Sequence, residues 1–384
     1  VGDAAQLLAR RPDLREAGHR LAAAWLEAAG ETEAMVLAQH YERGGDLHRA
    51  ATWFVQAVDM ALEGKDCAGV VERVERAVTC GVHGEQLGKL RLRQAEAHRW
   101  RGEFVESEKR GIEAIEILPK GSDAWLVAVG EMAAVFGKLG SVERVIELGD
   151  SMLEVCEDFV APGNEGLLGA LSRTSTAALM LSKNEMAEAL FQELERLVYG
   201  VDGPLAQAWL HRARAFRAPY VSYPGSSGKH FALSADAFAR AGDVRNACLQ
   251  RANYGAACLE YGDWRGAEGA LRPAIVDAER MGAKHIVSSA QRDLGYALAR
   301  CGQVTEARKL LEEAVAEFAA HGDRRLEGVG HDELAYILLL LGDLEPAENH
   351  ARLAVERLDM APAFLCHAKG SLARVLLARG QVEA

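Results

Sequence analysis

The residues best suited to binding a phosphate group lie in the stretch Ser-Tyr-Pro-Gly-Ser-Ser-Gly-Lys-His, residues 222–230. A phosphate-binding loop has the form Gly-x-x-x-x-Gly-Lys followed by Ser or Thr, and it follows a β-strand, because its backbone amides cradle phosphate and its hydroxyl binds magnesium. Here Tyr223 occupies the first glycine position and His230 follows Lys229. The preceding residues, 208–220, have the composition of a helix. We therefore interpret the stretch as a structural break and not as a nucleotide site.

Motifs for metal binding and catalysis are also missing from the sequence. The 12 histidines include no His-x-x-x-His pair and no His-Glu-x-x-His, so a helix-borne zinc site is unsupported. Paired acids such as Glu312 and Glu313 alternate with Lys and Arg at helical spacing, which is typical of a solvated face. No Gly-x-Ser-x-Gly nucleophile turn occurs. We expect a non-enzymatic chain with no catalytic residues, no cofactor and no metal.

The composition predicts an all-α protein. Only 9 prolines and 6% aromatic residues occur, which favours helices over β-sheet. A net charge of −12 disfavours nucleic acid and anionic membranes as partners. The seven cysteines form no Cys-x-x-Cys, so we expect small buried side chains in a reducing cytoplasm. No apolar run is long enough to cross a membrane.

A pattern recurs every 40 residues in the last third of the chain, in YGDWRGAEGALRPA (261–274), CGQVTEARKLLEEA (301–314) and LGDLEPAENHARLA (341–354). Each copy has a glycine at its second position (262, 302 or 342), an alanine five residues later, and a small residue seven before the glycine. The glycine can take the left-handed conformation that ends a helix. The small residues allow two helices to approach closely, so a bulky residue at Ala307 or Gly295 would cost about 1 to 3 kcal/mol.

These residues resemble the tetratricopeptide repeat, a helical hairpin with a usual period of about 34 residues. The resemblance implies a right-handed superhelix of about nine hairpins, each with helices roughly a turn longer than usual. Weaker copies predict earlier turns at Gly102, Gly140 and Asn184 and near Gly64. Asparagine fits such a turn because it tolerates the left-handed conformation better than most residues.

The first residues carry a second resemblance. Residues 17–31 (AGHRLAAAWLEAAGE) and 34–57 (AMVLAQHYERGGDLHRAATWFVQA) resemble the junction between the ATPase module and the repeats of bacterial STAND-type signalling ATPases, often fused to serine/threonine kinases. The resemblance implies an N-terminal helical segment over residues 1–45 and a continuous repeat array over 46–384. Because the chain starts at Val1 and ends within the recurring pattern, we expect a piece of a longer protein.

The repeat register selects candidate binding residues. In arrays of this family the first helix of each hairpin lines the concave surface, and positions about 13, 10, 9 and 6 before the turn glycine point inward. An early hairpin gives Arg93, Glu96 and Arg99. The later ones give Arg212, Phe216, Asn253, Arg292, Asp293, Tyr296, Asp332, Glu333, Tyr336, His367 and Arg374. This mixture of charged and aromatic side chains is typical of a groove for a protein or peptide segment.

Several alternatives stay open at this point. The tyrosines could serve packing alone, and the basic residues of 211–217 could either dock an acidic partner or neutralise neighbouring acids. The partner could be an attached ATPase or kinase module. A small-molecule effector pocket or a self-associating scaffold would be other functions, and the oligomeric state is undetermined.

The register also places the opening stretch. Counting back in steps of 40 from Gly262 leads to Ser222, so the stretch occupies a hairpin turn. Pro224 prevents a continuous helix there. We expect a degenerate turn or loop over residues 218–228.

Overall fold

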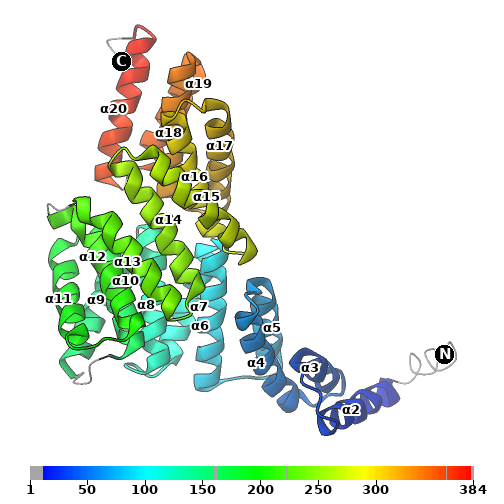
Figure 1. The fold of residues 1–384 in the computed structure, drawn as a ribbon. Helices are drawn as coiled ribbons and strands as arrows, with labels where there is room; N and C mark the ends of the chain where they lie inside the picture. Colours follow the sequence, from blue (N-terminus) through cyan, green and yellow to red (C-terminus); the bar gives the residue numbers. More distant parts are fainter. Residues whose placement is uncertain (1–11, 159–162, 222–223, 360, 382–384) are drawn as a thin grey trace. The chain divides into compact units, whose positions relative to one another are not determined.

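The fold comes from a computed structural model that describes residues 12–158, 163–221, 224–359 and 361–381. Within these ranges every regular element is helical: α-helices α2 to α20 and two short 3₁₀ helices (Figure 1). The prediction of an all-α repeat protein is confirmed. The helices α2 to α19 form nine consecutive pairs, followed by α20.

The chain divides into two compact units, and its boundaries run through α6 and α7. Unit 1 contains residues 1–98 and 109–122, and unit 2 contains residues 99–108 and 123–384. The helices that belong wholly or mainly to unit 1 are α2 (Pro12–Ala28), α3 (Ala34–Arg43), α4 (Leu47–Glu63), α5 (Cys67–Thr79), α6 (Gly84–Arg101) and α7 (Phe104–Ile117).

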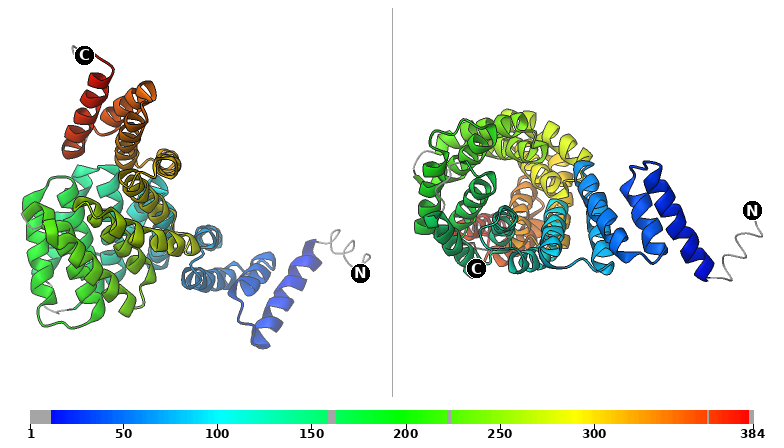
Figure 2. Two further views of the ribbon diagram at one scale, coloured as in Figure 1. Left: turned by 45° about the horizontal axis from the view of Figure 1, so that its top comes forward. Right: turned by 90° about the horizontal axis from the view of Figure 1, so that it is seen from below.

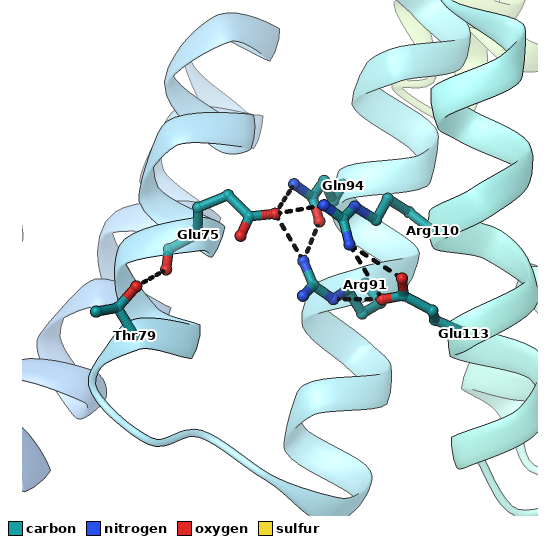
Figure 3. Close-up of polar contacts among 6 residues, drawn as sticks. All are labelled: Glu75, Thr79, Arg91, Gln94, Arg110 and Glu113. Atoms are coloured by element: carbon teal, nitrogen blue, oxygen red, sulfur yellow. Dashed lines mark hydrogen bonds and ion pairs between the residues drawn. The ribbon is translucent and has the colours of Figure 1, made fainter.

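An ion-pair network joins α5, α6 and α7 inside unit 1 (Figure 3). The Glu75 Oε1 atom accepts hydrogen bonds from Arg91 Nη1 and Gln94 Nε2, both at 2.8 Å, and lies 3.0 Å from Arg110 Nη2. Glu113 pairs with both arginines from the other side, at 2.8 Å and 3.0 Å. Burial acts to raise the pKa of Glu75, but the hydrogen bonds from Gln94 and Arg91 and the arginine charges outweigh it and lower the pKa.

Unit 2 holds the remaining helices. They are α8 (Asp123–Leu139), α9 (Val142–Asp158), α10 (Glu165–Met180), α11 (Asn184–Val198), α12 (Pro204–Arg217), α13 (Ser227–Arg240), α14 (Val244–Glu260), α15 (Trp264–Arg280), α16 (Lys284–Arg300), α17 (Val304–His321), α18 (Arg324–Leu341), α19 (Leu344–Arg357) and α20 (Pro362–Ala378). Within this unit each even-numbered helix is the first of a hairpin.

The repeats use one turn design. Gly262 and Gly302 take positive φ values of 74° and 83°, which closes the first helix of each hairpin. Asp263 then accepts a hydrogen bond from the Gly266 N–H at 2.9 Å and caps the following helix. In most of these turns the residue with positive φ lies two positions before the next helix, as at Gly140, Gly262 and Gly302, so the repeat register fixes its place.

One predicted turn position is wrong for this reason. Asn184 is the first residue of α11, and Ser182, with a φ of 60°, takes the left-handed conformation instead. The turn predicted near Gly64 is confirmed: Lys65, with a φ of 61°, takes the left-handed conformation, while Gly64 itself has a φ of −72°. In both turns the position in the repeat, and not the conformational preference of the residue, determines which residue is left-handed.

The helices of a hairpin approach closely at the predicted small residues. A Cβ atom built on Gly255 would lie 2.6 Å from the Leu271 Cγ atom, and one on Gly295 would lie 2.9 Å from the Leu311 Cγ atom. Ala307 is fully buried at the second crossing. Only glycine fits these two positions without displacing a core leucine.

The first helices of successive hairpins line up side by side within unit 2. Helix α10 contacts both α8 and α12, α16 contacts α14 and α18, and α18 also contacts α8. Seen along the axis of this unit, the helices from α8 to α16 follow one another around a ring (Figure 2, right). The superhelix therefore curves until its later repeats reach its early ones, which encloses the first helices.

The segment predicted as a loop over 218–228 differs in detail. Ala218–Val221 and Pro224–Ser226 form 3₁₀ helices, and α13 already begins at Ser227. The Ser227 hydroxyl donates a hydrogen bond to the Ala215 carbonyl at 2.9 Å, so the helix start is tied to α12. Residues 222 and 223 lie outside the described part of the chain. The segment does connect the two helices of a hairpin, but as short helical turns that end two residues earlier.

The cysteines and the hydropathy give two further findings. All seven cysteines carry free thiols, but Cys301 and Cys366 are exposed, contrary to the prediction that all are buried. Among the described helices, none is both long enough and apolar enough to cross a membrane.

Candidate functional site

A cavity of about 330 Å³ lies among the first helices of unit 2. Its walls come from the last turn of α6 and from the even-numbered helices α8 to α20. Side chains spaced three and four residues apart share one helix face, so each first helix presents one such face to the cavity. The cavity is thus a direct product of the superhelical curvature.

Five of the eleven predicted binding residues line this cavity: Arg212, Phe216, Asn253, Arg292 and Asp293. They come from α12, α14 and α16, three consecutive first helices. Arg99, selected from the earlier hairpin, lines it as well. Whether these residues bind a partner stays a prediction, but the fold brings them to one place.

The two predicted tyrosines lie elsewhere, in a stack that joins neighbouring repeats. The Tyr296 ring lies 6.0 Å from the Trp264 ring and 6.2 Å from the Tyr336 ring. The Tyr336 hydroxyl accepts a hydrogen bond from Arg300 Nη1 at 3.1 Å, and the guanidinium of Arg300 lies over both outer rings. This arrangement fits the packing interpretation of the tyrosines.

The remaining predicted residues lie on α18 and α20, away from the walls of the cavity. Asp332 is buried and pairs with His367 at 2.5 Å, while Glu333 lies 3.9 Å from Arg292 Nη1. Arg374 is exposed and donates to the Ser371 hydroxyl. Burial raises the pKa of Glu333 to about 8. Burial therefore favours the neutral form of this carboxyl group, while the charge of Arg292 opposes that effect.

The charges of the cavity wall are mainly positive. The cations are Arg99, Lys138, Arg173, Arg212, Arg292 and Arg325, and the acids in the wall are Asp293 and Glu260. Behind the wall the buried Glu131 pairs with Arg99 and, at 2.9 Å, with Arg173. Arg292 pairs with Asp293. Among the described residues, the other three of the six cations make no ion pair with a carboxylate.

Those three cations are Arg212, Lys138 and Arg325. Arg212 is buried and donates only to neutral oxygens, the Ser172 carbonyl at 2.9 Å and the Thr176 hydroxyl at 3.0 Å. Burial, followed by the charges of Arg173 and Arg99, lowers the pKa of Arg212 to about 9. Burial is also the largest cause that lowers the pKa of Lys138 to about 8.

A second cavity of about 350 Å³ adjoins the first, and its walls are mainly apolar. The two share Met180, Phe216, Asn253 and Phe364, among other residues. Tyr220 and Phe231 complete the apolar wall, and the Phe216 and Phe231 rings meet edge to face at 5.0 Å. A ligand that spans both cavities would meet cations at one end and aromatic rings at the other.

The sequence register missed four basic wall residues, Lys138, Arg173, His285 and Arg325. Arg173 lies nine residues before Ser182, so the correct turn would have selected it. His285 and Arg325 both lie seventeen residues before a turn glycine, one helical turn beyond the positions considered. Lys138 lies two before Gly140. Extending the register by one turn at each end would have found them.

The basic residues of 211–217 do not form one surface. Arg214 pairs with Glu195 at 2.8 Å, and Arg217 pairs with Glu188 at 2.7 Å. The Nδ1 atom of His211 lies 3.2 Å from that of His230. Apart from Arg212 in the cavity, these arginines neutralise neighbouring acids, the simpler of the two interpretations.

No group of three or more His, Cys, Asp or Glu side chains in the described part of the chain is arranged to hold a metal ion. Among known proteins, no family model and no curated sequence matches this chain.

Solved structures do match. One is a Signal Transduction ATPase with Numerous Domains (STAND) protein with a tetratricopeptide repeat sensor from Pyrococcus horikoshii, with a TM-score of 0.52 and 15% identity. Another is a Rap protein complexed with Competence and Sporulation Factor, with a TM-score of 0.51 and 13% identity. The chain has the tetratricopeptide-type helical repeat fold. The similarity covers 86% of this chain and 50% of the STAND protein, and 77% of this chain and 88% of the Rap protein. This chain thus spans about half the length of the STAND protein that it matches.

Proposed function

We propose that this chain is a non-enzymatic interaction and sensor region of a larger bacterial signalling protein, and that it binds a protein or peptide segment in the two adjoining cavities of unit 2. The observation that carries this proposal is the convergence of charged and aromatic side chains from α6 and the even-numbered helices α8 to α20 on two adjoining cavities. Polar groups that fix register and aromatic anchors are what a peptide site uses.

The similar structures support this choice. One is described as having a tetratricopeptide sensor, and the other was solved in complex with the Competence and Sporulation Factor. We further propose that the output is the regulation of ATPase or kinase modules in the same protein, with residues 1–45 as the junction. This part rests on the resemblance of residues 17–57 to that junction in STAND-type proteins.

The cavity volumes favour a second candidate function, a site for a small-molecule effector. Volumes of about 330 and 350 Å³ fall within the roughly 300 to 1,000 Å³ of known small-molecule sites. A thermal-shift screen with metabolites tests this candidate, because a ligand of the native state raises the melting temperature.

The peptide proposal is tested with binders selected from a random heptapeptide library displayed on phage. Phe216→Ala and Asn253→Ala, both in the cavity walls, should weaken the selected peptides at least tenfold. Tyr336 lies outside both cavities, so Tyr336→Ala serves as the matched aromatic control. If the selected peptides bound all three variants as tightly as the parent chain, while circular dichroism stayed helical, the proposed site would be wrong.

A further inference from the structure

The cavity of unit 2 has a charge opposite to that of the whole chain. The protein carries a net charge of −12, yet six cations and only two acids line this space. Acidic side chains on the surface commonly keep a protein soluble, but they do not explain why basic side chains outnumber acidic ones in this cavity. The contacts that each of these cations makes must therefore explain its presence.

Part of this excess is structural. Arg99 and Arg173 both pair with the buried Glu131, and Arg292 pairs with Asp293. The Glu131 pairs tie α6, α8 and α10 together, whereas Arg292 and Asp293 are consecutive residues of α16. None of these pairs needs a ligand. The remaining cations have no such explanation.

Lys138 and Arg325 make no hydrogen bond or ion pair among the described residues that would offset their burial. Lys138 lies over the Phe104 ring at 5.3 Å, and Arg325 lies over the Phe364 ring at 5.6 Å. The buried Arg325 Nε and Arg99 Nη2 atoms have no hydrogen-bond partner. An unsatisfied donor on a buried charged group is costly, so a protein seldom keeps one without use.

The cations also lie close enough to repel one another. Burial is the largest cause that lowers the pKa of Lys138. The charges of Arg325, Arg99 and Arg212 lower it further, while the charge of Asp323 raises it. Burial and, after it, the charge of Arg292 lower the pKa of Arg325, while the charges of Asp323 and Asp293 raise it. A group of neighbouring cations in a partly enclosed space creates a strong positive potential.

We propose that the ligand of this cavity carries a multiply charged anionic group that contacts Lys138, Arg212 and Arg325, and an apolar group that lies beside Phe216 and Phe364 in the adjoining cavity. The proposal rests on the proposed function for the location of the site and adds the chemistry of its ligand. Carboxylates of an acidic peptide and the phosphate of a free metabolite share this chemistry.

The way in which the two cavities adjoin supports the apolar group of the proposed ligand. Phe216 lines both, and the guanidinium of Arg212 lies 4.9 Å from its ring, so the cationic and aromatic walls meet there. Phe364, 42% exposed, and Tyr220, 54% exposed, are among the most exposed aromatic side chains of the described residues. An apolar group next to the anion would cover them.

Isothermal titration calorimetry on the full chain at pH 7 and low salt tests the proposal with three probes. They are inorganic pyrophosphate and two capped peptides of equal length, Glu-Asp-Glu-Leu-Phe and Lys-Arg-Lys-Leu-Phe. Pyrophosphate and the acidic peptide should bind, and Lys138→Gln and Arg325→Gln should each weaken both roughly tenfold, the usual worth of one charged hydrogen bond. Lys309→Gln, at a lysine on α17 with a side chain 76% exposed, should change nothing.

A second readout separates binding from folding. Lys138→Gln removes a partly buried charge that makes no hydrogen bond or ion pair among the described residues, so its melting temperature should equal or exceed that of the parent chain while its affinity falls. A fall in both would point to a structural role for Lys138 and would overturn its assignment to the ligand.

The outcomes distinguish this inference from the proposed function. Equal binding of both peptides, or unchanged affinity in Lys138→Gln, overturns the anion assignment and leaves a peptide site in place. Binding of pyrophosphate alone, weakened in Lys138→Gln, supports the anion assignment with a free anion as ligand, and it counts against the peptide proposal. Binding of none of the three probes overturns the inference.

Discussion

Replacement of Gly255 by alanine tests the close packing of the repeats. Alanine in place of a helical glycine stabilises a helix by up to about 1 kcal/mol. At this position, however, the new Cβ atom would lie 2.6 Å from Leu271 Cγ and 2.7 Å from Leu271 Cδ2. Leu271 is fully buried in α15, so its side chain would have to shift within the core. Overpacking of this kind costs about 1 to 3 kcal/mol, so we expect a net loss of stability of up to about 2 kcal/mol.

Gly269→Ala is the matched control, since Gly269 is exposed on α15 and nothing lies within 4 Å of its Cβ position. It should gain up to about 1 kcal/mol. The two variants should therefore differ by about 1 to 3 kcal/mol in urea unfolding followed by circular dichroism, with faster hydrogen exchange in α14 and α15 of Gly255→Ala. If Gly255→Ala proved as stable as Gly269→Ala, the close approach of these two helices would be refuted.

Three further predictions concern charged groups. Burial, followed by the charges of His350 and Arg357, lowers the pKa of His331 to about 4. As the pH falls, the unfolded chain therefore binds the proton first, and the free energy of unfolding should decrease by about 3 kcal/mol between pH 6.5 and 4. His331→Gln should flatten this part of the profile of stability against pH, measured by urea unfolding. Glu75→Ala removes the acceptor that joins three helices of unit 1, and it should lower the free energy of unfolding by about 1 to 2 kcal/mol in the same measurement. The control Glu72→Ala, at an exposed residue, should lower it by less than about 0.5 kcal/mol. Equal losses in the two variants would show that the network contributes nothing. Lys138→Met should raise the free energy of unfolding at pH 7 by about 1 to 3 kcal/mol. The gain should shrink above pH 8, because the native lysine then loses its proton. A gain that did not depend on pH would contradict the burial of a charged lysine.

The repeat pattern made the fold predictable because it is local. A glycine, the small residues around it and the apolar positions between them specify one hairpin, and neighbouring hairpins repeat the same contacts. The same reasoning placed Arg212, Asn253 and Arg292 on one helix face, and the structure brings them to one cavity. The turn at Ser182 was misplaced at Asn184, because the repeat register selects the turn position regardless of the residue there.

Other features depend on contacts that the sequence does not encode locally. Tyr296 and Tyr336 follow the repeat register as closely as Arg292 does, but they stack along the repeats with Trp264 and Arg300. His367 and Asp332 lie 35 residues apart and pair only because α18 and α20 are neighbours. Position along a helix face is not sufficient to tell a cavity wall from a packing layer.

The sequence by itself determined the all-α repeat fold, the hairpin turns and the face of each first helix that carries polar groups, because these depend on residues within one 40-residue unit. Tertiary structure alone decided that the superhelix curves until α18 meets α8, and that curvature gathers Lys138, Arg212 and Arg325 around one space. The small rotation between successive repeats adds up over the array, so its result is a property of the whole unit.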